Sequence, residues 1–94
     1  MRYPIAIEPG DASHAFGVAF PDLPGCYSAG DTLDEAIDNA HEAAQLWLET
    51  LVDDGGSIPP ARPISEHYTN PEFAGWIWAL ISIDLPAFHE TLQR

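Results

Sequence analysis

The sequence contains no lysine, and arginine occurs only at Arg2, Arg62 and Arg94. Aspartate and glutamate together number 15, so the 94-residue chain has a formal net charge of −12 at pH 7. Nucleic-acid binding depends on lysine and arginine side chains that neutralise phosphates, and anionic membranes likewise attract basic surfaces. We therefore expect this chain alone to bind neither DNA nor RNA nor a membrane. Its charge favours a basic protein as partner.

Cysteine is almost as scarce, because Cys26 is the only one. An intramolecular disulfide is thereby excluded, which fits a reducing compartment. We interpret Cys26 as a small buried residue rather than a nucleophile. No apolar run follows Arg2, as it would in a signal peptide, and the longest apolar run, residues 75–83, is far shorter than the ~20 residues of a membrane span. These absences predict a soluble, cytoplasmic protein.

Motifs for catalysis and metal binding are also missing. The four histidines are scattered singly and are predicted to lie on the surface, at His14, His41, His67 and His89. There is no glycine-rich phosphate loop and no Ser-His-Asp arrangement. One catalytic alternative is a Mg²⁺-dependent nuclease that uses carboxylates at Glu8, Asp22, Asp31, Asp34 or Glu35. Because three isolated arginines could hardly hold a polyanionic substrate, we expect no enzyme activity, no metal and no cofactor.

Four segments have the patterns of strands. Residues 3–8 and 15–20 alternate large and small or polar side chains and predict a hairpin, and residues 26–29 predict a short third strand. Pro4 places the first strand at a sheet edge, or at least marks a strand start. Residues 76–83 are apolar on both faces and rich in β-branched and aromatic side chains, which predicts a central or doubly covered strand.

One helix has clear start and stop signals. Thr32 and Glu35 form a capping box, apolar residues recur at helical spacing from Leu33 to Leu51, and two glycines at 55–56 end the pattern. Between this helix and the last strand, residues 57–74 hold four prolines and little periodicity, so they predict a long irregular connection. The chain is therefore expected to form one α+β domain.

The last strand also predicts self-association. A single helix can cover only one face of a sheet, so the second apolar face of residues 76–83 would lie exposed in a monomer, where large apolar patches are rare. A second subunit would bury that face. We therefore expect a homo-oligomer, with a two-fold dimer as the leading arrangement and an interface that contains Trp76, Trp78 and Leu80.

The stretch from Phe20 to Ala40 reads F-P-D-L-P-G-C-Y-S-A-G-D-T-L-D-E-A-I-D-N-A. It resembles the diagnostic core of the HicB-like antitoxins. In that pattern a proline-bracketed Asp-Leu-Pro-Gly-Cys turn joins two strands, and Gly-Asp-Thr precedes a helix with Glu-Ala and Asn-Ala pairs. The resemblance extends from Tyr3 to Leu51 and on to the Trp-Ile-Trp at residues 76–78.

The resemblance implies a partial ribonuclease-H-like fold, with an antiparallel sheet, one main helix on one face, and the order strand, strand, strand, helix, strand. It also implies an antitoxin domain over residues 1–84, with residues 85–94 as a tail that could begin a DNA-binding region. The implied function is to neutralise a small, basic, RNA-cleaving toxin of the HicA class without any activity of its own. An acidic inhibitor suits a basic toxin because opposite charges speed association.

Four carboxylates are the expected toxin contacts: Asp22 in the proline-bracketed turn, and Glu35, Asp38 and Glu42 on the polar side of the helix. An oligomeric protein-binding module with an unrelated partner would share every one of these features, and only the co-purifying partner would distinguish it. We expect no binding to operator DNA, because the residues after Ile83 are too few for a DNA-binding motif and include a single arginine.

Overall fold

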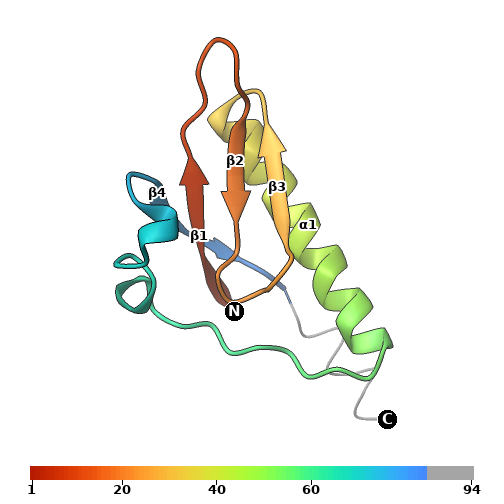
Figure 1. The fold of residues 1–94 in the computed structure, drawn as a ribbon. Coiled ribbons are helices and arrows are strands. Elements are labelled where there is room, and N and C mark those ends of the chain that lie inside the picture. Colours follow the sequence, from red (N-terminus) through yellow and green to blue (C-terminus); the bar gives the residue numbers. More distant parts are fainter. Residues whose placement is uncertain (85–94) are drawn as a thin grey trace.

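Residues 1–84 are the part of the chain that the computed structural model describes, and the predicted tail, residues 85–94, lies outside them. The strands form one antiparallel sheet of order β3-β2-β1-β4, and the long helix lies along one face of it (Figure 1). This arrangement confirms the predicted α+β fold. In chain order the elements are β1 (Arg2–Glu8), β2 (Phe16–Ala19), β3 (Tyr27–Gly30), α1 (Leu33–Asp53), the short 3-10 helices η1 (Ile64–Glu66) and η2 (Pro71–Phe73), and β4 (Ile77–Ser82).

Helix α1 begins and ends where its capping residues predict. The Thr32 hydroxyl accepts a hydrogen bond from the Glu35 N–H (3.1 Å), and the Glu35 carboxylate reaches back to the N–H of Asp31 (3.4 Å). The helix ends at Asp53, and Gly55 turns the chain with a φ of +84°, a left-handed conformation that glycine adopts without strain. None of the helices in residues 1–84 combines the length and the apolar character that a membrane span requires.

The inner side of α1 approaches the sheet closely because its buried residues are mostly small. They recur every four positions, at Ala36, Ala40, Ala44, Leu48 and Val52. At the tightest point, a Cβ on Gly30 would collide with the backbone of Ala36, so only glycine fits there. The main core lies between α1 and the large apolar side chains of the helix-facing side of the sheet, among them Tyr3, Ile5, Ile7, Val18, Phe20, Ile81 and Ile83.

The predicted edge position of the first strand was wrong, because β1 lies between β2 and β4. Pro4 is the third residue of β1 and so lies near the strand start, as the other alternative had it. Met1 and Ile83 exchange two backbone hydrogen bonds (3.1 and 2.8 Å). Hydrogen-bonded and non-hydrogen-bonded pairs alternate along an antiparallel ladder, so the odd-numbered residues of β1 bond to β4. The nitrogen of Pro4, an even-numbered residue, therefore faces β2. The pairing of β2 with β1 starts only where Ala6 lies opposite Ala19, so the missing N–H of Pro4 costs no ladder bond.

The predicted central strand, residues 76–83, is an edge strand. Within residues 1–84, β4 pairs with β1 alone, and its Ile77 and Leu80 are each 45% exposed. The second face of the sheet is partly covered by the chain itself. Phe73 packs there on Ala6 and Ala19, together with the half-buried rings of Trp76 and Trp78. The sequence-based argument that only a second subunit could cover this face therefore does not hold.

Candidate partner-binding surfaces

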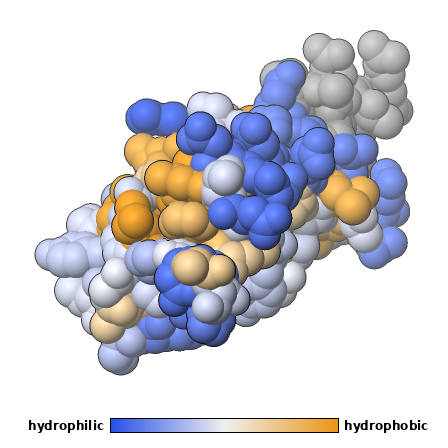
Figure 2. Space-filling view, turned by 90° about the horizontal axis from the view of Figure 1, so that it is seen from above, coloured by the Kyte–Doolittle hydropathy of each residue, from blue (hydrophilic) through white to orange (hydrophobic). Residues whose placement is uncertain are grey.

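The outer side of α1 carries a row of carboxylates, which we call the acidic helix face: Glu35, Asp38, Glu42 and Glu49. All of them are exposed, because they lie opposite the buried stripe of the helix. The ion pairs within residues 1–84 join other side chains, so none of these four charges is neutralised by a neighbouring cation there. Figure 2 shows how strongly hydrophilic and hydrophobic residues gather into separate regions of the surface. The structure thus brings three of the four predicted toxin contacts together.

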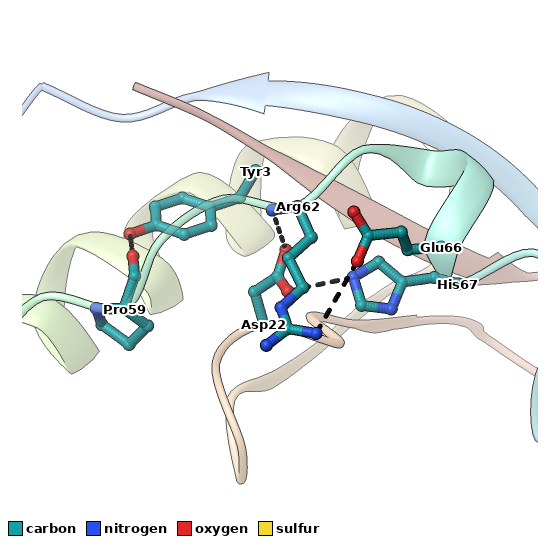
Figure 3. Close-up of polar contacts among 6 residues, drawn as sticks. All are labelled: Tyr3, Asp22, Pro59, Arg62, Glu66 and His67. Atoms are coloured by element: carbon teal, nitrogen blue, oxygen red, sulfur yellow. Dashed lines mark hydrogen bonds and ion pairs between the residues drawn. The ribbon is translucent and has the colours of Figure 1, made fainter.

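The fourth predicted contact, Asp22, lies elsewhere and is engaged within the chain. Its side chain is 4% exposed. One carboxylate oxygen accepts the backbone N–H of Arg62 (3.0 Å), and the other lies 2.9 Å from Nε2 of His67 (Figure 3). A carboxylate that is buried and bonded in this way supports the fold rather than offering its charge to a partner, so we leave Asp22 out of the docking surface.

Asp22 is one of two polar anchors of residues 57–76, which we call the connecting segment. The second anchor is Tyr3, whose hydroxyl donates to the carbonyl of Pro59 (2.6 Å; Figure 3). Burial, and next the negative charge of Asp22, raise the pKa of the Tyr3 hydroxyl, so this group stays a neutral donor at physiological pH. These two anchors hold the connecting segment in place, although the segment has no regular apolar stripe of its own.

His67 was predicted to lie on the surface, but the structure places it in a largely buried position. Only 15% of its side chain is exposed, and its ring stacks on Trp78 with an interplanar angle of 8° and a centroid separation of 6.4 Å. The sequence offers no local signal for this group, because Asp22 and His67 are 45 positions apart. His14 is exposed as predicted, and its hydrogen bond, followed by that of the Ser13 N–H, lowers the pKa of Asp11.

The candidate catalytic groups do not assemble into a reactive centre. Cys26 is buried as predicted, and this burial raises the pKa of its thiol to about 11, which keeps it protonated and unreactive. The carboxylates considered for Mg²⁺ remain dispersed, and residues 1–84 contain no group of three His, Cys, Asp or Glu side chains placed to hold a metal ion.

The predicted oligomer contacts lie on and beside β4. Trp76 and Trp78 are half-buried against Phe73, with ring centroids 5.2 and 5.6 Å from it, so part of their surface is used within the chain. Leu80 is more open and lies beside Arg2 and Ile64 in a shallow hollow. Ile77 is equally exposed but lies on the opposite, helix-facing side of β4.

The sequence matches one family over nearly its whole length. A family model described as the HicB_like antitoxin of bacterial toxin-antitoxin systems covers residues 3–94. An uncharacterised 14.9 kDa protein of Haemophilus phage HP1 is 40% identical over 85 residues, which span 90% of this chain and 62% of that protein. Antitoxin HicB 1 of Photorhabdus laumondii is 36% identical over 70 residues, which span 74% of this chain and 44% of that protein. The chain thus matches about half of the length of these relatives.

Solved structures share the fold. The N-terminal domain of the Burkholderia pseudomallei antitoxin HicB superposes with a TM-score of 0.78 at 40% identity, over 90% of this chain and all of that domain. A chain of the HicA3 and HicB3 toxin-antitoxin complex superposes with a TM-score of 0.74 at 32% identity, over 89% of this chain and 99% of that chain. Both similarities include the sheet and the helix that carries the acidic helix face.

Proposed function

The chain belongs to the HicB-like antitoxins of bacterial toxin-antitoxin systems, and from this premise we propose that it binds and neutralises a small, basic, RNA-cleaving toxin of the HicA class. The similar chain in the HicA3 and HicB3 complex supports a toxin as the partner. In this proposal the protein acts by occupying the toxin's RNA-binding surface and cleaves nothing itself.

The acidic helix face is the observation that carries the proposal. Glu35, Asp38 and Glu42 are exposed on one side of a capped helix whose other side is buried in the core. Their positions are therefore fixed by the fold, so little ordering is needed when a partner binds. A toxin surface that binds RNA must be basic, and opposite charges steer two such surfaces together and orient them.

The site of action that fits best is the cytoplasm, where an RNA-cleaving toxin finds its substrate. The single cysteine is buried and protonated, which suits a reducing compartment. The charge of −12 argues against a direct role in RNA binding, because every approach to a phosphate backbone would be opposed by repulsion.

Co-expression with the product of the small reading frame beside its gene, followed by pull-down and an RNA-cleavage assay, tests the proposal. We expect the toxin to co-purify and its cleavage activity to be suppressed by the added chain. If the chain cleaves RNA in the presence of Mg²⁺, the nuclease alternative is correct. If a protein without ribonuclease activity co-purifies instead, the chain is a binding module with another partner.

Charge reversal tests the surface itself. The double variant Asp38→Lys/Glu42→Lys should slow association with the toxin by roughly tenfold or more at low salt, and the slowing should shrink as salt screens the charges. The matched control is Glu8→Lys/Glu72→Lys, which makes the same charge change at exposed positions outside α1. Equal slowing by both double variants would show that net charge, rather than the acidic helix face, governs association.

A further inference from the structure

Leu46 is a large apolar residue on the outer side of α1, among the carboxylates of the acidic helix face, and it is 67% exposed. Residues three or four positions apart lie side by side on a helix, so Leu46 neighbours Glu42 on one side and Glu49 on the other. Asp53 follows two turns after Leu46 on the same side of the helix, and all three carboxylates are exposed. The acidic side of α1 therefore surrounds one open apolar side chain.

A hollow of about 330 Å³ adjoins Leu46 near the end of the helix. Its walls are Trp47, Thr50, Leu51 and Asp54. Thr50 lies one turn after Leu46, so the leucine side chain borders the hollow at this residue. A single exposed leucine is common on protein surfaces. A leucine beside a hollow walled by a tryptophan and a second leucine, however, offers an apolar side chain of a partner both room to insert and a surface to contact.

The charge around this site favours a basic partner. The last turn of α1 contains no basic residue, and Asp53 and Asp54 lie at the C-terminal end of the helix, where the macrodipole disfavours further negative charge. Glu49 adds a third carboxylate one turn earlier, and none of the ion pairs found in the described residues, 1–84, neutralises these groups. Lysine or arginine side chains from a partner would relieve this repulsion, whereas a second copy of the same acidic surface would increase it.

We propose that Leu46 is the apolar anchor of the toxin interface. The toxin places an apolar side chain on Leu46 and into the adjoining hollow, and lysine or arginine residues around that side chain face Glu42, Glu49 and Asp53. Apolar groups at the centre of an interface lose their water and carry much of the binding energy, while the polar groups around them keep water out. The inference rests on the proposed function and specifies which part of the helix holds the toxin once it has docked.

Charge and apolar contact should affect different rate constants. The carboxylates attract the toxin before contact, so their reversal slows association, and salt weakens this effect. The contacts of Leu46 form only in the docked complex, so their loss should speed dissociation. We expect Leu46→Ala to raise the Kd by roughly tenfold, through faster dissociation and by the same factor at low and at high salt. Leu46→Met retains the apolar volume and should bind like the wild type.

Surface plasmon resonance, with the product of the adjacent small reading frame immobilised as the toxin, measures both rate constants, and circular dichroism confirms that each variant is folded. Tyr68→Ala is the control, because it removes an exposed ring from the connecting segment rather than from α1 and should change neither rate constant.

The outcomes separate this proposal from the proposed function. If Leu46→Ala dissociates no faster while Asp38→Lys/Glu42→Lys still associates slowly, the anchor is wrong and the proposed function stands. If the wild-type chain binds no toxin, both are wrong. A smaller mass of the free Leu46→Ala chain in light scattering would assign Leu46 to a contact between copies and would likewise overturn the anchor.

Discussion

The two faces of the sheet differ in what covers them. Helix α1 covers the first face. It follows β3 after a two-residue turn and packs on the sheet through a regular stripe of apolar side chains. The connecting segment is held by polar contacts between residues 40 to 56 positions apart. Its Ile58 and Ala61 pack against the main core, and it covers the second face through Phe73 and Trp76. The covering of the first face therefore follows from a local pattern, whereas that of the second face also depends on contacts between distant residues.

The largest effect is expected on the helix-covered face. Leu48→Ala removes a fully buried side chain from the main core, so it should lower the free energy of unfolding by about 2 to 5 kcal/mol. Urea denaturation of the two proteins measures the difference. Leu46→Ala is the matched control on the same helix, because Leu46 is 67% exposed, and it should change stability very little. Similar losses in both variants would contradict the assigned burial.

A smaller effect is expected where the second face is anchored. Asp22→Ala leaves the Arg62 N–H and the His67 ring without their acceptor, which should cost about 1 to 3 kcal/mol. Hydrogen exchange should become faster at the amide of Arg62, while the amides of α1 remain protected.

Glu66→Ala is the control for Asp22→Ala. It removes only the exposed contact with Arg62 at 3.7 Å, and such surface pairs contribute little to stability. If Glu66→Ala destabilises the protein as much as Asp22→Ala does, the buried carboxylate is not the anchor of the connecting segment.

The smallest expected effect is a pH dependence of stability, which tests whether the Cys26 thiol is shielded from water in the main core. The pKa of Cys26 is raised from 9.0 to about 11 in the folded protein. The neutral thiol therefore contributes stability that is complete below pH 9 and is lost as pH rises through 11. The stability advantage of wild type over Cys26→Ala should shrink between these values, as followed by urea denaturation at each pH. The titration of Tyr3 is common to both proteins and cancels, and an unchanged difference would mean that the thiol contacts water.

The sequence predicts the first face well because its signals are local. The capping residues of α1, its apolar stripe and the exposed position of Glu35, Asp38 and Glu42 all follow from spacing within one helix. The first three strands and their order along the chain follow from alternation in the same way. These are the elements in which a residue's environment is decided by neighbours a few positions away.

The second face could not be predicted because its contacts join distant residues. The proline-bracketed turn suggested an exposed Asp22, but its partners lie in the connecting segment, which has no periodic pattern. The apolar character of residues 76–83 indicated a central or doubly covered strand. The strand lies at the sheet edge, but both of its faces are partly covered, with Ile81 in the main core on one side and Trp78 against Phe73 on the other. Pro4 suggested an edge strand because proline lacks the N–H that a central strand donates. It fits in β1 because the pairing with β2 begins only at Ala6, and the residues around Pro4 do not reveal where β2 ends.

The pairing of β1 with β4 also constrains how the protein folds. This strand pair joins the two ends of the described chain, with Met1 bonded to Ile83, so the entropy cost of closing the loop spans nearly the whole domain. High contact order of this kind slows folding. During synthesis, β4 leaves the ribosome after the other strands and α1. The backbone groups of β1 that pair with β4 therefore stay without partners until residue 83 has emerged. We therefore expect the docking of β4 to limit the rate at which newly made protein becomes native.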